Sequence, residues 1–355
     1  MPIVKGFAST FGFKQDAPQS GGTYRTPVLV AAGDGLEPVS ESISQDVELI
    51  ESEALTGSRT RTAGDRGNEF HAGDLELEAK YEGLDVLLAM VLGTAIAPVQ
   101  QGADDAYLHE FRVQDTDLEG LFGTLVIDKQ LEVWEYPSVK VNSLTIAATA
   151  GGLTTVTANL IASNLARNTS AGTNNETTIA AITIPANRDF LLWEQLAVRM
   201  NIQSAGAIAD ADLVYPNEFS ITFNNNMVAD DVSTRFGREI EEPCPDNFLD
   251  VTGSINFGRY NTENNKFVTA HFDKVIQKMD VIFTGPLADG ATNFSFKVLL
   301  PSLQIASGDV NIGGPGRVPA NFEFTSSKAS TVPTGFTQTQ VTMELINQRN
   351  TAVIT

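Results

Sequence analysis

Alternating apolar and polar positions recur along much of the chain, as expected for half-buried β-strands. In residues 74–81 (DLELEAKY), leucine and alanine alternate with charged side chains. Residues 218–228 (EFSITFNNNMV) show the same alternation and then reach an asparagine run. Residues 144–163 contain two β-rich runs on either side of a Gly-Gly pair, which predicts a hairpin. The pattern therefore predicts a mainly β protein.

Two segments instead carry apolar residues at helical spacing. Residues 81–93 (YEGLDVLLAMVLG) form one apolar stripe, and Gly93 is expected to end the helix. Residues 261–280 (NTENNKFVTAHFDKVIQKMD) form a second stripe, with Asn261 as the expected N-cap. Each predicted helix follows a strand that ends at a tyrosine, so the two segments share one local context.

The likeness between the two halves of the chain extends beyond these helices. Residues 136–163 (YPSVKVNSL…AGGLTTVTANLIAS) resemble residues 300–326 (LPSLQIASG…IGGPGRVPANFEFTS) at offsets of 162 to 164. Gly73 corresponds to Gly253 at an offset of 180, so the first half needs an insertion, which we expect within residues 100–120. These matches predict an internal duplication.

The boundary of the duplication is predicted from composition. Residues 168–178 (NTSAGTNNETT) are polar and small, as is typical of a domain boundary, although a loop tip would have the same composition. We therefore expect two tandem β-rich domains, each with one short α-helix. The first comprises residues 1–180 with an N-terminal arm, and the second comprises residues 181–355 with a C-terminal arm.

The formal net charge of −21 over 355 residues limits the possible partners. A surface this acidic repels phosphate backbones, so non-specific nucleic-acid binding is disfavoured. Halophilic solvation and a surface built to repel DNA are two explanations that the charge alone leaves open. No apolar run approaches the 18 residues of a transmembrane helix, and the N-terminal residues lack a signal-peptide pattern, so we expect cytoplasmic synthesis without membrane insertion.

Candidate catalytic and metal-binding residues are sparse in this sequence. The histidines, His71, His109 and His271, lie far apart and have no chelating spacing. Cys244 lies between two prolines with acids nearby, which raises a thiol pKa and disfavours a nucleophile. The glycine-rich residues 313–319 (GGPGRVP) lack the Lys and Ser/Thr of a phosphate-binding loop. We expect no enzymatic activity, no metal and no cofactor.

Charged residues nevertheless suggest two kinds of assembly surface. An arginine-rich loop holds Arg59, Arg61 and Arg66, and the second half offers Arg235 and Arg238 at the matching place before the Gly253 strand. Because arginine pairs well with carboxylates, we expect these loops to dock onto an acidic protein surface; a surface hairpin with incidental charge is the alternative.

Acidic residues alternate along two segments. Asp74, Glu76 and Glu78 lie on one face of the strand predicted over 74–81, as the side chains of a solvated strand face do. The acids of residues 40–53 alternate with Val47 and Leu49, which favours a solvated sheet face over paired catalytic carboxylates.

Two segments resemble the major tail tube proteins of long-tailed bacteriophages. They are residues 123–164, with a YPSVKVNSLT strand before a Gly-Gly hairpin, and the strand–helix unit of residues 68–93. The resemblance implies two tandem β-sandwich or barrel domains, each with one flanking α-helix, in a fold related to the tube of type VI secretion systems. It also implies subunits that pair their sheets edge to edge in rings, and rings that stack into a conduit for genome ejection. The arginine loops would then dock onto the adjacent subunit or ring. A chain with two fused domains would then form a trimeric, pseudo-hexameric ring.

The same resemblance implies a protein of the virion tail whose partners are further copies of itself, the tail terminator, the baseplate or tail tip, and the tape measure protein. DNA would pass through the lumen without specific binding. Asp74, Glu76 and Glu78 are candidate lumen-facing acids, and an ordinary solvated outer face is the alternative for them. Another virion protein of β-sandwich type, such as a capsid decoration or baseplate protein, is the nearest alternative. A carbohydrate-binding module is a third, although Trp134 and Trp193 lie in different halves with apolar neighbours.

Overall fold

The computed structural model describes residues 5–16, 23–55, 57–167, 172–228, 237, 240–308 and 310–354. The fold is mainly β, as the sequence predicts. The helices within the described residues are short: α1 (Asp85–Leu92), α2 (Glu176–Ile179) and α3 (Asn265–Phe272).

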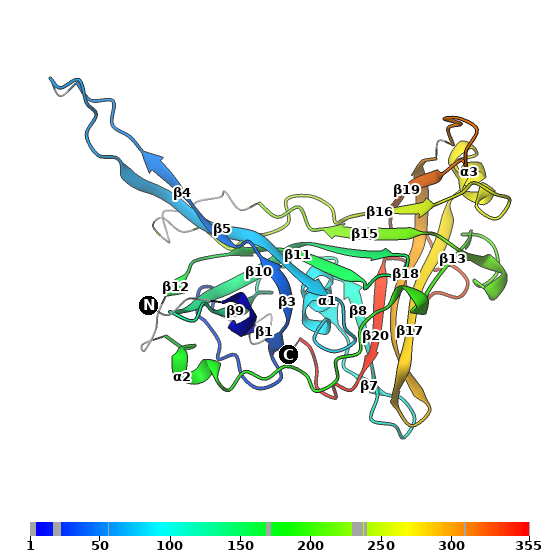
Figure 1. Ribbon diagram of the computed structural model, residues 1–355, viewed down its shortest axis with the longest axis horizontal. Coiled ribbons are helices and arrows are strands. Elements are labelled where there is room, and N and C mark those ends of the chain that lie inside the picture. The colour runs from blue at the N-terminus through cyan, green and yellow to red at the C-terminus, as the bar shows by residue number, and fades with distance from the viewer. Residues whose placement is uncertain are drawn as a thin grey trace.

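One antiparallel sheet, here called the long sheet, passes through both halves of the chain (Figure 1). Its strands, in order across the sheet, are β3 (Pro38–Glu41) with β4 (Ser44–Ile50), β5 (Asp65–Glu78), β11 (Thr155–Ala162), β10 (Val133–Thr149), β15 (Glu218–Asn224), β16 (Asp250–Phe257), β19 (Ala320–Ser326) and β18 (Thr292–Ser307). The pairing of β10 with β15 joins the two halves into one sheet.

The two longest strands of the chain, β10 and β18, each leave the long sheet and enter a second one. The first part of β10 pairs with β9 (Gly123–Asp128) and β12 (Ala166–Arg167), and beyond β9 lie β1 (Phe11–Gln15) and β2 (Gly35–Leu36). The first part of β18 pairs with β17 (Gln277–Asp289) and β20 (Thr342–Asn347), and beyond β17 lie β13 (Leu196–Ile202) and β14 (Leu213–Val214). The order of pairing is the same in both halves.

The registers of these pairings also repeat. Gly73 lies opposite Leu160, and Gly253, 180 residues later, lies opposite Phe324, 164 residues later. The pairing of β10 with β11 is irregular between Val141 and Ser143, and that of β18 with β19 is irregular at the positions 164 residues later. A side chain would collide with neighbouring backbone at both glycines, so the same close approach occurs twice.

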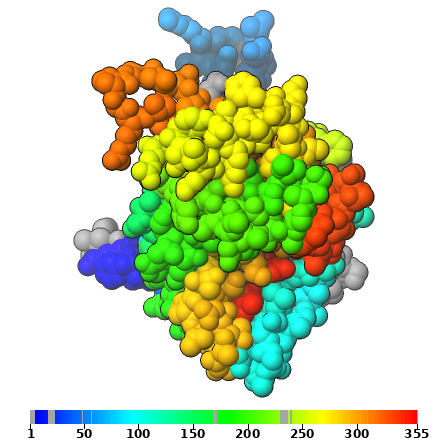
Figure 2. Space-filling model, turned by 90° about the vertical axis from the view of Figure 1, so that its right-hand side faces the viewer, coloured from blue at the N-terminus to red at the C-terminus, as the bar shows by residue number. Residues whose placement is uncertain are grey.

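Between α1 and β9 the first half holds a segment that the described residues between α3 and β17 do not repeat: β6 (Gly93–Ala95), β7 (Val99–Gln100) and β8 (Tyr107–Val113). Strand β8 pairs with β20 of the second half. The β7–β8 turn lies beside the β17–β18 turn (Figure 2), where Asp104 accepts hydrogen bonds from Ala291 N and the Thr292 hydroxyl. Strands of the two halves therefore pair with each other, and the two halves are in direct contact.

The predicted alternations and the hairpin match the structure. Residues 74–78 lie in β5, and β10 and β11 form the antiparallel hairpin around the Gly-Gly pair. In β15, Phe219, Ile221 and Phe223 are buried. The core lies between this apolar face of the long sheet and the second sheets, and it includes α1. In β15 and β19, buried side chains occupy every second position, so these strands show one face to the core and the other outward.

The first predicted helix is confirmed in type and in its end. Helix α1 stops at Gly93, whose φ of 96° is left-handed, and Gly93 N donates to Ala89 O. The prediction over 261–280 is wrong in its second part, because α3 ends at Phe272 and residues from Gln277 onward form β17. Lys274 adopts a φ of 52°, which a continuing helix does not allow.

Candidate assembly surfaces

The outward face of the long sheet, here called the polar face, is almost entirely hydrophilic. Each position lies beside its neighbours in register, from β5 across to β19. The positions are Asp74, Glu76, Glu78, Thr155, Thr157, Asn159, Ser143, Thr145, Ala147, Thr149, Glu218, Ser220, Thr222, Asn224, Asp250, Thr252, Ser254, Asn256, Asn321, Glu323 and Thr325. Ala147 is the one apolar residue among them, and lysine and arginine do not occur at these positions.

Hydrogen bonds between neighbouring strands hold the side chains of the polar face. Asn159 Nδ2 donates to Asp74 Oδ1 at 2.7 Å, and the hydroxyl groups of Thr145 and Thr222 lie 2.9 Å apart. Asn256 Nδ2 donates to Glu218 Oε2 at 3.1 Å. Such cross-strand contacts restrict the rotamers of the polar side chains. The result is an anionic surface of hydrogen-bonded side chains, which repels phosphate groups.

The structure places the predicted acids Asp74, Glu76 and Glu78 together on this face of β5. Glu76 Oε2 also accepts from the Ser40 hydroxyl at 3.0 Å. Sequence reasoning missed the remaining acids of the polar face, Glu218, Asp250 and Glu323. The alternation in residues 218–224 places Glu218 opposite the buried phenylalanines, so that pattern could have identified it.

Strands β4 and β5 continue beyond the body of the molecule as a projecting hairpin, here called the arm (Figure 1). Arg59 and Arg61 lie in the exposed loop between the strands, and Arg66 lies exposed near the start of β5. The Arg61 guanidinium forms an ion pair with Glu51 within the arm. Arg235 and Arg238 lie outside the described residues.

The arm also exposes large apolar side chains. Leu49 and Ile50 are more than half exposed, and Leu55 is fully exposed. The acids of residues 40–53 are predicted to form a solvated sheet face with Leu49 on the opposite face. In the structure Leu49 does not lie against the core. Three exposed aliphatic side chains beside arginines are typical of a surface that another protein covers.

The C-terminal segment fastens the second half to the start of α1. Arg349 Nη1 lies 2.9 Å from Oδ2 of the buried Asp85, and Asn347 Nδ2 donates to Tyr81 O at 3.3 Å. Gln348 N donates to Glu82 Oε1 at 2.6 Å, and burial raises the Glu82 pKa to about 7. Because Asp85 is buried, its charge requires the guanidinium as a partner.

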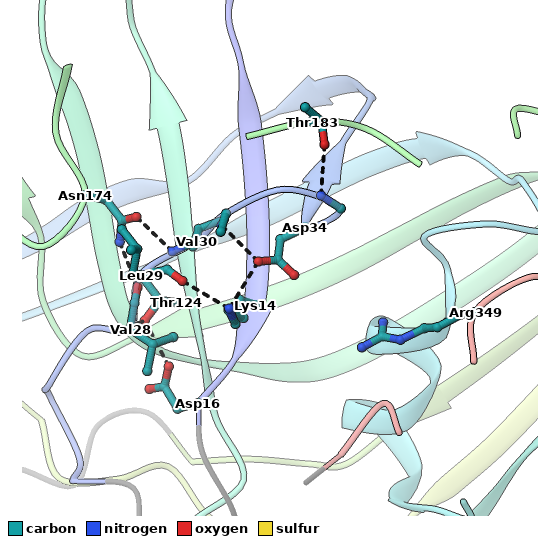
Figure 3. A network of polar contacts seen from close by, with 12 residues as sticks. Lys14, Asp16, Val28, Leu29, Val30, Asp34, Thr124, Asn174, Thr183 and Arg349 are labelled. Atoms are coloured by element: carbon teal, nitrogen blue, oxygen red, sulfur yellow. Dashed lines mark hydrogen bonds and ion pairs between the residues drawn. The ribbon is translucent and has the colours of Figure 1, made fainter. Parts of the chain in front are cut away.

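A polar network ties the N-terminal strand region to the segment that follows β12 (Figure 3). Asn174 Oδ1 accepts from Val30 N at 2.9 Å, and Asn174 Nδ2 donates to Glu135 Oε2 at 2.8 Å. The Thr124 hydroxyl donates to Asp16 Oδ1 at 3.0 Å. Burial, together with the nearby Glu135 carboxylate, raises the Asp16 pKa to about 7.

The residues considered for catalysis lie in structural settings. His109 Nε2 is 2.8 Å from Arg349 O, and His271 Nδ1 is 3.0 Å from Ile305 O. Desolvation raises the Cys244 pKa, which lowers its nucleophilicity at neutral pH. Within the described ranges, no cluster of three or more His, Cys, Asp or Glu side chains suits a metal ion. No helix among the described residues is long and apolar enough to cross a membrane.

Comparison with known proteins gives one family. The family model described as "Phage tail tube protein" matches residues 6–326. A solved structure described as "Virion of native gene transfer agent (GTA) particle" aligns at 13% identity and a TM-score of 0.26, covering 39% of this chain and 94% of the other. Among curated proteins, no significant match is found.

Proposed function

The chain belongs to the phage tail tube protein family, and we propose that it forms the tube from rings of three copies, each copy contributing two tandem tube domains. It is a structural protein of the virion tail that assembles with itself into a tube. The family has a structural role, and we propose that the chain carries no enzymatic activity. Family membership alone does not give three parts of this proposal: the trimeric ring, its pseudo-sixfold character and the passage of the genome.

Two tandem domains account for the repeated pairing of the strands. Six strands of the first half have counterparts with the same neighbours in the second half: β1 in β13, β2 in β14, β5 in β16, β9 in β17, β10 in β18 and β11 in β19. We place the division near residue 180, so that residues 1–180 and 181–355 each form one domain. Three such chains would present six similar domains around a ring.

The observation that carries the proposal is the polar face. It spans both halves of the chain without interruption and bears six carboxylates and no cationic side chain at its paired positions. Each lysine or arginine that pairs with a DNA phosphate stabilises the bound state, so a conduit free of such contacts lets the duplex slide. The proposal assigns the polar face, with Asp74, Glu76 and Glu78, to the lumen.

The arm supplies the contact between stacked rings. It projects from the body and presents arginines together with exposed aliphatic side chains. The acidic chain offers many carboxylates on a neighbouring ring with which Arg59, Arg61 and Arg66 can pair. Arg235 and Arg238 would act in the same way from the second domain.

Beyond copies of itself, the proposed partners are those of a tube that ends at both sides and encloses an internal protein: a tail terminator, a baseplate or tail-tip protein and a tape measure protein. DNA passes without specific binding, and the proposal includes no cofactor.

Electron microscopy of the purified protein tests this function. We expect hollow tubes built of stacked rings. Discrete closed particles or soluble trimers that never stack would instead favour a capsid decoration or baseplate protein.

A further inference from the structure

The hairpin of β18 and β19 is incomplete when compared with its counterpart in the first half. Strand β10 continues to Thr149 and pairs with β11 from Thr155 onward. Strand β18 ends at Ser307, and β19 begins only at Ala320. The described residues between these two ends take part in no strand pairing.

The two hairpins differ in what lies beside them. In the first half, β15 covers the open edge of β10 from Ser143 to Thr149. In the second half, no described residue pairs with β18 on the matching edge beyond Leu303. His271 Nδ1 lies 3.0 Å from Ile305 O, but the residues that follow Ser307, here called the extension, have no described strand partner on either edge. A strand without a partner leaves its N–H and C=O groups to solvent, which explains why the extension is irregular.

Side-chain burial also indicates that the extension lacks a partner. Val310 corresponds to the buried Ile146 at an offset of 164 and already packs against the core. Ile312 corresponds to Ala148, which is 2% exposed, yet Ile312 itself is 80% exposed. The extension therefore begins along the path of its counterpart, but its last apolar side chain is left in water.

At the opposite end of the long sheet, β3 and β4 form the other open edge. Both pair with β5 on one side, and no described strand pairs with their other side. They correspond to β15 at an offset of 178, because Ser44 lies opposite Ala72 as Thr222 lies opposite Thr252. Strand β15 is the strand that covers β10.

Edge-to-edge joining of neighbouring copies is expected for the family; we propose that these two open edges make that contact in the register of the β10–β15 pairing, which serves as a template within the chain. Ser143 lies opposite Asn224 and Ile146 opposite Ile221 in the template. Transferred by the two offsets, Ser307 of one copy lies opposite Asp46 of the next, and Val310 lies opposite Ile43. This inference rests on the proposed ring and specifies the contact between neighbouring copies, here called the joint.

The transferred register satisfies the side chains as well as the backbone. Ile43 is buried and faces the core, so it meets Val310 on the core side, as Ile221 meets Ile146 in the template. A slip of one residue would place a serine, Ser42 or Ser44, opposite Val310 and reverse the faces of one strand. A continuous polar face across the joint follows from the same register.

Disulfide cross-linking measures this register. Asn225 N donates to Asn142 O in the template, so the next pair, Ser143 and Asn224, is a close pair without backbone hydrogen bonds. In a Cys244→Ser background, Ser307→Cys with Asp46→Cys should give oxidised species that form a ladder ending at three chains on a non-reducing gel. Ser143→Cys with Asn224→Cys is the matched control, which should cross-link within one chain.

A third variant, Ser307→Cys with Ser44→Cys, keeps the face but shifts the register by two residues, and it should cross-link at least tenfold more slowly. Rings seen by microscopy without the Ser307–Asp46 cross-link, while the matched control forms, would overturn the joint and leave the proposed function intact. A ladder that continues past three chains would retain the joint and contradict the trimer. Absence of rings and tubes would overturn both.

Discussion

The hydroxyl groups of Thr145 and Thr222 lie 2.9 Å apart across the pairing that joins the two halves of the long sheet. Directly beneath, on the core side, Ile146 lies opposite Ile221, and both are buried. The junction thus has a polar face outside and an apolar contact inside. Its stability is expected to depend on the apolar side.

Ile146→Ala should therefore lower the free energy of unfolding by about 2–5 kcal/mol, because it removes buried methyl groups and leaves a cavity. Thr145→Ala removes one partly exposed hydrogen bond and should cost only about 0.5–1.5 kcal/mol. Urea unfolding of the disassembled subunit measures both values. Equal losses would contradict an apolar junction.

The ion pair of Arg349 and Asp85 should stabilise the docking of the C-terminal segment. Arg349→Met leaves the buried Asp85 carboxylate without its cation, which should cost up to about 3 kcal/mol, since part of the guanidinium faces water. Adding Asp85→Asn should recover much of this loss. Thermal unfolding of both single variants and the double variant measures the coupling, and strictly additive losses would show that the pair does not interact.

Asp16 and Glu82 should make the folded state less stable as pH rises. Both carboxyls have a pKa of about 7 in the folded protein, above their ordinary values near 4. Their stabilising contribution is complete below pH 4, where both states hold the proton, and is lost as pH rises to about 7. Asp16→Asn and Glu82→Gln should each flatten the melting temperature between pH 4 and 7.5. An unchanged slope in both variants would contradict the assignment.

Reversing charge in the arm should block stacking without unfolding the subunit. Arg59→Glu with Arg61→Glu removes the cations that would face carboxylates of the next ring and replaces them with like charges. Sedimentation and electron microscopy should then show rings but no tubes at normal salt. Lys274→Glu with Arg167→Glu makes the same change of net charge outside the arm and should still give tubes. Normal tubes from the arm variant would exclude the docking role.

Introducing cations on the polar face should make tubes retain DNA. Glu76→Lys with Glu78→Lys adds two potential phosphate contacts per chain on the proposed lumen. Tubes of this variant should retain short duplex DNA at low salt and release it as the salt concentration rises. Glu119→Lys with Glu263→Lys has the same net charge change at exposed positions off this face and should not retain DNA. Equal retention by the two variants would contradict the assignment of the lumen.

Local patterns predicted the strands because each alternation has one buried face. Residues 74–78 and 218–224 form strands whose apolar positions are buried, and Gly93 ends α1 as its left-handed conformation requires. The second helix was predicted too long, because Met279 fits both the helical stripe and the alternation of β17, where it is buried opposite Met200. Periodicity alone does not separate the two over so short a segment.

Local sequence patterns do not predict which strands pair when the strands are far apart along the chain. Nothing in residues 107–113 indicates that they pair with residues 342–347, because both simply alternate. The polar face likewise depends on which strands are neighbours: Glu218 and Glu76 belong to one surface only once β15, β10, β11 and β5 are placed side by side. The matched glycines of the sequence indicate the duplication. Only the strand pairings show that the registers of the two halves agree.

A cryo-electron microscopy map of the assembled tube, with its ring symmetry determined, tests the trimeric ring and the lumen together. We expect three chains per ring, six similar domains around the lumen, and the polar face lining it. A ring with six chains, or a lumen lined by another face of the chain, would contradict the proposal.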